Sequence, residues 1–208
     1  MTHNPEHVKQ LEDIASAKGQ TRPLTFGVPH VFKALQLLQQ DRFVSRNSFC
    51  GALHLGEGAV KTMIRRLKAH GLADSIRSGT HLTPDGTVLA RSLAAVISCE
   101  VPVKSAILGD LHGHAVLVRG GASLVRTGIE QRDFAIMYGA SVVLTLVFCN
   151  GNFSFPGEQT GALELHAGLH HALGSLGPQE GDVVIIASGP DPFAAELAAK
   201  NSALRTLA

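Results

Sequence analysis

The segment Ala59–His70 constrains the fold of this chain more than any other part of it. At 100° per residue, its apolar side chains share one arc of about 100°, and most of its cations share a second arc about 120° away. The apolar set is Val60, Met63, Ile64 and Leu67, and the cationic set is Lys61, Arg65 and Lys68. The pattern predicts a helix that packs through one face and presents positive charge on another.

The residues on either side of this helix predict a tight turn before it and a hairpin after it. Gly56–Gly58 supply backbone freedom for the turn, and Gly71 ends the helix. Beyond it, a turn at Ser78-Gly79 joins two short strands, the second ending at Leu82. Thr83 then caps a further helix, which starts at Pro84 and runs to about Ser98.

Two helices are expected before the turn. The first begins near Pro29 and is apolar at helical spacing; a shorter one follows Ser45, whose hydroxyl can cap it. Three helices followed by a β-hairpin make a winged helix that contains a helix-turn-helix. Residues 1–20 are expected to form a polar arm, flexible or weakly helical, with a stripe at Val8, Leu11 and Ala15.

Beyond residue 100 the apolar pattern changes its period. The expected strands are 103–109, 114–119, 141–149, 152–155 and 182–187, and the expected helices are 128–138, 160–174 and 192–206. This order is ββαββα with a βα tail, which predicts a two-layer sandwich. The chain is therefore expected to be α+β, with an N-terminal winged helix-turn-helix domain over 1–99 and an α+β domain over 100–208.

Charge is unevenly divided between the two halves. Residues 1–98 carry 12 Lys and Arg against 7 Asp and Glu, whereas residues 99–208 carry 6 against 10. A basic module joined to a mildly acidic one is typical of a nucleic-acid-binding part attached to a part with another task.

Composition excludes several protein classes. The apolar runs are shorter than the roughly 20 residues of a membrane span, and the polar N-terminus is unlike a secretory signal. We therefore expect a cytoplasmic protein with no membrane association. Cys50, Cys99 and Cys149 are widely spaced and form no CxxC pair, which argues against disulfides and cysteine zinc sites.

The run LGEGAVKTMIRRLKAHGLADSIRSGTHLTPDG resembles the recognition-helix and wing signature of prokaryotic winged-helix transcription regulators. With GIEQRDFAIMYGA and EGDVVIIAS, the whole chain resembles a small archaeal family that joins such a winged helix to an uncharacterised C-terminal domain. The order of C-terminal elements is similar to the GAD-like ββαββα architecture, named for an insertion domain of some aspartyl-tRNA synthetases. The resemblance implies a DNA-binding regulator and identifies no effector.

The basic helix suits double-stranded DNA, because the major groove admits one helix whose Lys and Arg side chains can reach phosphates or guanine edges. The expected contacts are Lys61, Thr62, Arg65, Arg66, Lys68 and, from the wing, Arg77. A solvated basic face with no partner is the simpler alternative, and RNA or protein is another partner for such a module.

A second motif, GDLHG at 109–113, is similar to the first metal-binding motif of calcineurin-like phosphoesterases. The further motifs that two metal ions require are absent from the sequence, so GDLHG is better interpreted as a hairpin turn. A weaker metal hypothesis remains for His112 and His114 with His166 and His170, which can close a site only if the two pairs converge.

The C-terminal half offers one further candidate site, for a small anionic effector at the start of the 128–138 helix. Its residues are Arg119, Arg126, Glu130, Arg132 and Asp133. Helix capping and internal ion pairs are the alternative interpretation. Without a nucleophile–base pair, a P-loop or a GxGxxG motif, we expect no enzymatic activity, cofactor or metal.

The leading hypothesis is a homodimeric DNA-binding transcription regulator whose C-terminal domain dimerises, senses a ligand or both. The alternatives are a C-terminal enzyme-like or metal-binding domain with an accessory winged helix, and an RNA- or protein-binding adaptor.

Overall fold

The computed structural model describes residues 5–16, 23–109, 111–158 and 167–208. They form two compact units, Pro5–Ala94 and Ala95–Ala208. Each contains helices and a separate antiparallel sheet, so the expected α+β class is confirmed.

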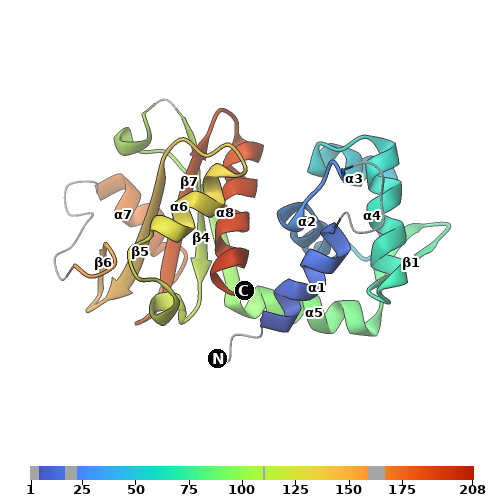
Figure 1. The fold of residues 1–208 in the computed structure, drawn as a ribbon, viewed down its shortest axis with the longest axis horizontal. Coiled ribbons are helices and arrows are strands. Elements are labelled where there is room, and N and C mark those ends of the chain that lie inside the picture. The colour runs from blue at the N-terminus through green and yellow to red at the C-terminus, as the bar shows by residue number, and fades with distance from the viewer. Residues whose placement is uncertain (1–4, 17–22, 110, 159–166) are drawn as a thin grey trace. The chain divides into compact units, whose positions relative to one another are not determined.

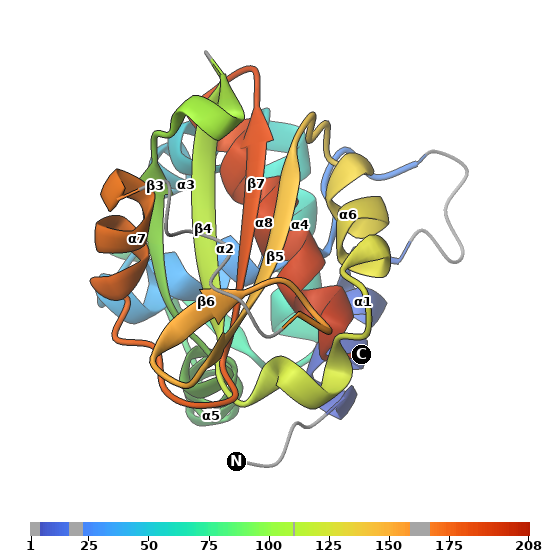
Figure 2. The same ribbon diagram turned by 90° about the vertical axis from the view of Figure 1, so that its left-hand side faces the viewer.

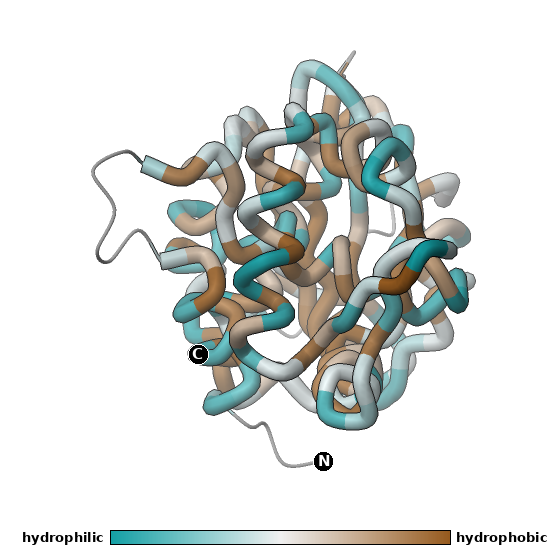
Figure 3. Tube along the Cα trace, turned by 90° about the vertical axis from the view of Figure 1, so that its right-hand side faces the viewer, coloured by the Kyte–Doolittle hydropathy of each residue, from teal (hydrophilic) through white to brown (hydrophobic). Residues whose placement is uncertain are grey.

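The N-terminal unit is built from helices and one hairpin. Its elements are α1 (Pro5–Ala15), α2 (Val28–Gln40), α3 (Arg46–Leu53), α4 (Glu57–Ala69), β1 (Ala73–Ile76), β2 (Gly79–Leu82) and α5 (Pro84–Val96), which continues into the second unit. Hydrophobic and hydrophilic residues alternate along its helices at helical spacing (Figure 3). Each helix can therefore bury one side and leave the other in water.

Of the two expectations for the N-terminus, a flexible arm or a weakly helical segment, the described residues 5–16 follow the helical one. Val8, Leu11 and Ile14 are almost completely buried, and α1 packs against α2 and α4. Arg66 of α4 donates hydrogen bonds to the backbone oxygens of Ile14, at 2.7 Å, and Ser16. The buried stripe and these bonds at the C-terminal end of α1 make it an integral helix of the unit.

The hairpin is attached to the helices at two places. Val44, just before α3, exchanges two backbone hydrogen bonds of 2.9 Å with Thr80 of β2. Thr83 caps α5 by accepting from the Gly86 amide at 3.1 Å, and its hydroxyl donates to the Gly71 oxygen after α4. Ile76 pairs with Gly79, so the loop consists of Arg77 and Ser78 and lies one residue earlier than expected.

A buried histidine near the start of α2 predicts a pH dependence of stability. The Nδ1 atom of His30 accepts a hydrogen bond from the Gly27 amide at 3.2 Å. Burial, assisted by the nearby Lys33 charge, lowers the pKa of His30 from 6.5 to about 4. Between pH 6.5 and pH 4, His30 is mostly protonated in the unfolded chain and mostly neutral in the folded chain. Lowering the pH through this range therefore favours the unfolded chain and destabilises the fold.

We expect His30→Gln to remove this pH dependence while keeping an acceptor for the Gly27 amide. Wild-type protein should lose about 1–2 kcal/mol more stability than the variant between pH 7 and pH 5. Urea titrations at both pH values, followed by far-UV circular dichroism, measure this difference. Equal losses in the two proteins would contradict the prediction.

The C-terminal unit follows the expected order of elements. After β3 (Ile97–Val103) come the 3₁₀ turn η1 (Ala106–Leu108), β4 (His112–Val118) and a second 3₁₀ turn, η2 (Gly121–Leu124). The rest are α6 (Ile129–Ile136), β5 (Val143–Cys149), β6 (Asn152–Ser154), α7 (Ala167–Gly174), β7 (Val183–Gly189) and α8 (Pro192–Thr206). Asp191 caps α8 by accepting from the Ala194 amide at 2.9 Å.

The five strands form one antiparallel sheet in the order β3-β4-β7-β5-β6 (Figure 2). The last strand in the sequence, β7, lies in the middle, and all of its residues are buried. β3 lies at an edge, where Pro102 can be accommodated because its missing N–H need not pair with a second strand.

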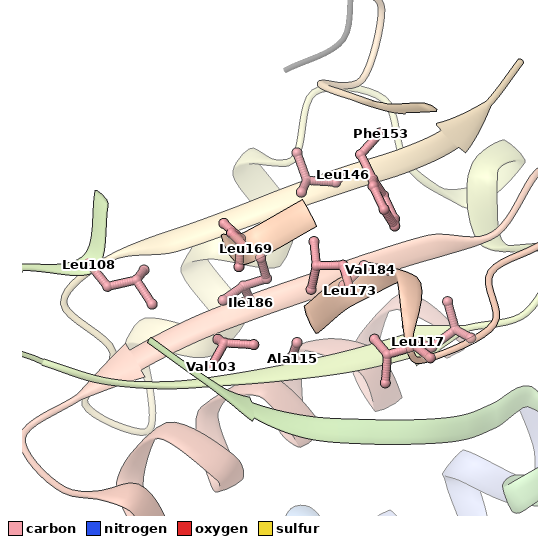
Figure 4. Close-up of a cluster of buried hydrophobic side chains, with 11 residues drawn as sticks. Val103, Leu108, Ala115, Leu117, Leu146, Phe153, Leu169, Leu173, Val184 and Ile186 are labelled. Atoms are coloured by element: carbon pink, nitrogen blue, oxygen red, sulfur yellow. The ribbon is translucent and has the colours of Figure 1, made fainter. Parts of the chain in front are cut away.

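The two-layer expectation is wrong, because helices cover both faces of this sheet. Figure 1 shows α7 on one face and α6 and α8 on the other. Leu169 and Leu173 of α7 pack into a cluster of buried side chains with Val184 and Ile186 of β7 (Figure 4). The intervening strand residue, Ile185, is also buried and therefore faces α8 on the opposite side.

The first strand of the sheet begins six residues earlier than expected, at Ile97 instead of 103. As a result, the connection between the antiparallel strands β3 and β4 is longer than expected and contains the turn η1, and His112 and Gly113 of GDLHG already belong to β4. Gly109 has a φ of 62°, which a glycine adopts without strain. Asp110 lies outside the described residues.

Candidate functional site

A groove of about 730 Å³ lies in the N-terminal unit between α4, the start of α3 and the hairpin. Its lining residues are Val44, Ser45, Arg46, Asn47, Lys61, Ile64, Arg65, Lys68, Ser75, Ile76, Arg77, Ser78, Gly79 and Thr80. We call this feature the basic groove.

The charge of the basic groove has one sign. Five of its lining residues are Lys or Arg, contributed by α3, α4 and the hairpin loop, and none is Asp or Glu. All five are exposed to solvent. Because like charges gathered on a concave surface reinforce one another, the groove attracts anions, and a polyanion most strongly.

The helix α4 supplies three of these cations through its predicted two-sided pattern. Val60, Met63 and Leu67 are completely buried, which fixes the rotation of the helix about its axis. Lys61 and Arg65 lie one turn apart on the exposed side and line the groove, as the sequence predicted.

Lys68 has an additional role within the fold. Its Nζ atom lies 2.9 Å from the Asp74 carboxylate of β1, and this hydrogen bond is the main cause that lowers the pKa of Asp74. Both side chains are exposed, so the pair contributes little to stability. It does connect α4 to the hairpin, and it reduces the charge that Lys68 can offer to a ligand.

Two of the expected contact residues lie outside the basic groove. Thr62 donates its hydroxyl hydrogen to the Gly58 oxygen of its own helix at 2.9 Å and lines a separate hollow with residues 23–26. Arg66 is occupied by the carbonyl groups at the end of α1. Their positions on α4, roughly 100° or more from Lys61, carry them away from the groove.

The structure also brings in residues that sequence reasoning missed. Arg46 and Asn47, in the first turn of α3, line the groove opposite Lys61 and Arg65. Ser45 caps this helix by accepting from the Ser48 amide at 3.1 Å, as expected. The Ser45 cap allowed the sequence to predict that Arg46 begins a helix. The pairing of Val44 with Thr80, which brings the start of this helix beside the hairpin, was not predictable from the sequence.

The expected anion site in the C-terminal unit is not assembled around Arg119. This guanidinium donates to the Ser98 hydroxyl at 3.0 Å, the Gly177 oxygen at 2.8 Å and the buried Asp182 carboxylate at 2.6 Å. The Nε and Nη1 groups of Arg119 therefore donate inside the fold, and a role for Arg119 in binding an effector remains a prediction.

The other residues of that expected site lie in or near the first turns of α6. Arg132 pairs with its neighbour Asp133 at 3.1 Å, and both side chains are more than half exposed. Arg126 and Glu130 are also exposed. A ligand role for these four residues remains a prediction.

One described histidine from each expected pair, His114 and His170, lies on a different face of the sheet. His114 lies on the α8 face of the sheet, where its Nε2 atom is 3.1 Å from Glu100, whereas His170 of α7 packs edge-on against Phe153 on the other face. His166 lies outside the described residues. Among the residues that are described, no group of three or more His, Cys, Asp and Glu side chains is placed to hold a metal ion.

Comparisons with known proteins agree with a fold of this kind. A family model described as a domain of unknown function (DUF4443) matches residues 110–207, slightly less than half of the chain. The fold is similar to that of the hypothetical protein PH0730 from the archaeon Pyrococcus horikoshii OT3, with a TM-score of 0.70 and 24% sequence identity over 86% of this chain and 91% of that chain. No curated protein matches the sequence. These findings fit the expected likeness to an archaeal family with an uncharacterised domain.

Within the described ranges, no helix combines the length and the apolarity needed for a membrane span.

Proposed function

We propose that this protein is a DNA-binding transcription regulator whose N-terminal unit acts as a winged helix-turn-helix. In this interpretation α3 and α4 are the helix-turn-helix and β1–β2 is the wing. The observation that carries the proposal is the basic groove, in which five cations from three elements surround a concavity without a lining carboxylate. The alternative, a solvated basic face of α4 with no partner, does not explain why cations from α3 and the hairpin line the same groove.

The arrangement suits duplex DNA better than a small anion. With 13 residues, α4 is about 20 Å long. A major groove about 12 Å wide accepts one such helix. Lys61 and Arg65 would then face base edges or phosphates. Arg77 at the hairpin loop and Arg46 at the start of α3 would hold the backbone on either side, as positioning contacts do in other helix-turn-helix proteins.

We propose that the C-terminal unit dimerises the protein. We also propose that the protein acts by binding DNA and catalyses no reaction. Three large apolar side chains of the α6 region are more than half exposed: Ile129, Ile136 and Met137. Such exposure is typical of surfaces that associate. A homodimer would place two basic grooves on paired half-sites and so multiply the affinity for DNA.

A salt titration of DNA binding tests the proposal. If all five groove cations contact phosphates, log K against log salt should have a slope of about −4.5 per protomer. Lys61→Ala combined with Arg65→Ala should reduce the magnitude of that slope by about 2 and weaken binding to all sequences. Fluorescence anisotropy with labelled genomic fragments measures both quantities.

Lys9→Ala is the matched control, because Lys9 is an exposed cation of the same unit on α1 that does not line the groove. It should leave the slope almost unchanged. Equal effects of control and groove variants would mean that only net charge matters. A helix that enters a major groove should prefer DNA, because the deep, narrow major groove of A-form RNA excludes it. If duplex RNA competes more strongly than duplex DNA, the protein is an RNA-binding adaptor and the proposal is wrong.

A further inference from the structure

A second hollow in the N-terminal unit, of about 470 Å³, has the composition of a ligand pocket. Its wall comes from the end of α2, the residues after it, the hairpin and α5. The lining residues are Leu38, Gln39, Arg42, Phe43, Ile76, His81, Leu82, Thr87 and Arg91. We call it the α2–α5 pocket; Ile76 of the hairpin lines both this pocket and the basic groove.

The charged groups of the α2–α5 pocket are two arginines from different elements. Arg42 follows α2, and Arg91 belongs to α5. The lining contains no Asp or Glu, and neither arginine forms an ion pair with any residue that the structure describes. A guanidinium presents several donors in a planar fork that matches a carboxylate, so two of them favour an anionic ligand.

Most of the remaining lining is apolar or aromatic, and Gln39 and Thr87 add uncharged polar groups. Leu38, Phe43, Ile76 and Leu82 offer hydrocarbon surface, and the Arg42 guanidinium lies over the Phe43 ring at 5.4 Å. Ile76 is 53% exposed in spite of its size. An inorganic ion would leave this surface in water, whereas a ligand with an apolar body would cover it.

His81 provides an independent sign of an incomplete site. Its ring stands edge-on to Phe43 at 5.5 Å, and its buried Nδ1 atom has no hydrogen-bond partner among the described residues. Unpaired buried polar atoms are uncommon because burial removes their hydrogen bonds to water without a replacement.

From these observations we propose that the α2–α5 pocket binds a small organic carboxylate with an aromatic or branched apolar body. The carboxylate would lie between Arg42 and Arg91, and the body against Phe43, Ile76 and Leu82. The volume falls within the roughly 300–1,000 Å³ of small-molecule sites. Binding at this pocket does not depend on whether the basic groove binds DNA.

Titration of the full chain with benzoate tests the proposal, with amide and imidazole signals followed by nuclear magnetic resonance. Benzoate should shift the signals of Ile76, His81 and Leu82 in a saturable way. Benzamide, which has the same shape without the charge, and acetate, which has the charge without the ring, should each bind at least about tenfold more weakly. Equal binding of all three, or no saturable shift with benzoate, would overturn the proposal.

A pair of variants separates this pocket from general charge effects and from DNA. Arg42→Ala with Arg91→Ala should weaken benzoate binding about tenfold or more, whereas Arg65→Ala, in the basic groove, should leave it within about twofold. Unchanged amide signals elsewhere verify that each variant is folded. If the double variant weakens duplex binding and leaves benzoate binding unaltered, the two arginines are DNA contacts and the pocket proposal is wrong.

Discussion

Gly86→Ala is expected to unfold most of the N-terminal unit. A β-carbon at this position of α5 would lie 1.8 Å from the backbone oxygen of Leu72, well inside contact distance. That oxygen also accepts the Thr83 amide at 3.1 Å, and Thr83 holds both Gly86 and the Gly71 carbonyl. The atoms in the way belong to the backbone at the junction of α4 and β1, so they cannot move as a side-chain tip can.

We expect a loss of at least about 3 kcal/mol, at the upper end of what overpacking a core costs. Gly51→Ala is the matched control: Gly51 is also helical, and an added β-carbon there would meet nothing within 4 Å. That change should be neutral or stabilise by up to about 1 kcal/mol. Native-state amide exchange at residues of α4 and α5 measures the stability of both variants. Similar protection in the two variants would contradict the prediction that a β-carbon at Gly86 clashes with the Leu72 backbone.

The second large effect is expected from Asp182→Ala in the C-terminal unit. Asp182 is 3% exposed. Its carboxylate accepts from the Arg119 guanidinium at 2.6 Å and from the amides of Gly120 and Gln179, both at 2.8 Å. Removing it leaves two backbone donors and part of a guanidinium without their acceptor, which should cost about 3–5 kcal/mol.

Asp133→Ala is the control for Asp182→Ala. It removes the same group from another Arg–Asp pair, with Arg132, in which both side chains are more than half exposed. Water can replace that partner, so the loss should be below about 1 kcal/mol. Tyr138, the single tyrosine of a chain without tryptophan, lies in this unit, and its fluorescence follows urea unfolding of the unit by itself. Equal losses of stability in the two variants would mean that burial of the Arg119–Asp182 pair contributes little to the stability of the unit.

Local sequence signals predicted most elements of the fold. The two faces of α4, the cap at Ser45 and the start of α5 after Thr83 all depend on residues within one or two turns of each other. The errors occurred where the local signal was weak. β3 follows α5 directly, and no Gly or Pro marks the boundary between Val96 and Ile97.

The candidate site was predictable only in part, for the same reason. Four of the predicted contact residues line the basic groove: Lys61, Arg65, Lys68 and Arg77. Arg46 was missed, because its place there requires Val44 to pair with Thr80, far along the chain. Thr62 and Arg66, also expected as contacts, lie outside the groove, and the packing of α1 against α4 that engages Arg66 is not visible in the helical period.

The sequence by itself determined which segments are helices, which face of α4 is apolar, and that the N-terminal half is basic, because periodicity and charge are properties of neighbouring residues. Only the tertiary structure decided which distant groups meet. It placed β7 at the centre of its sheet, paired Arg119 with Asp182, and gathered five cations around one concavity. Such contacts depend on how the buried faces of helices and strands pack together. The local sequence pattern is compatible with several packing arrangements, and the tertiary structure selects one of them.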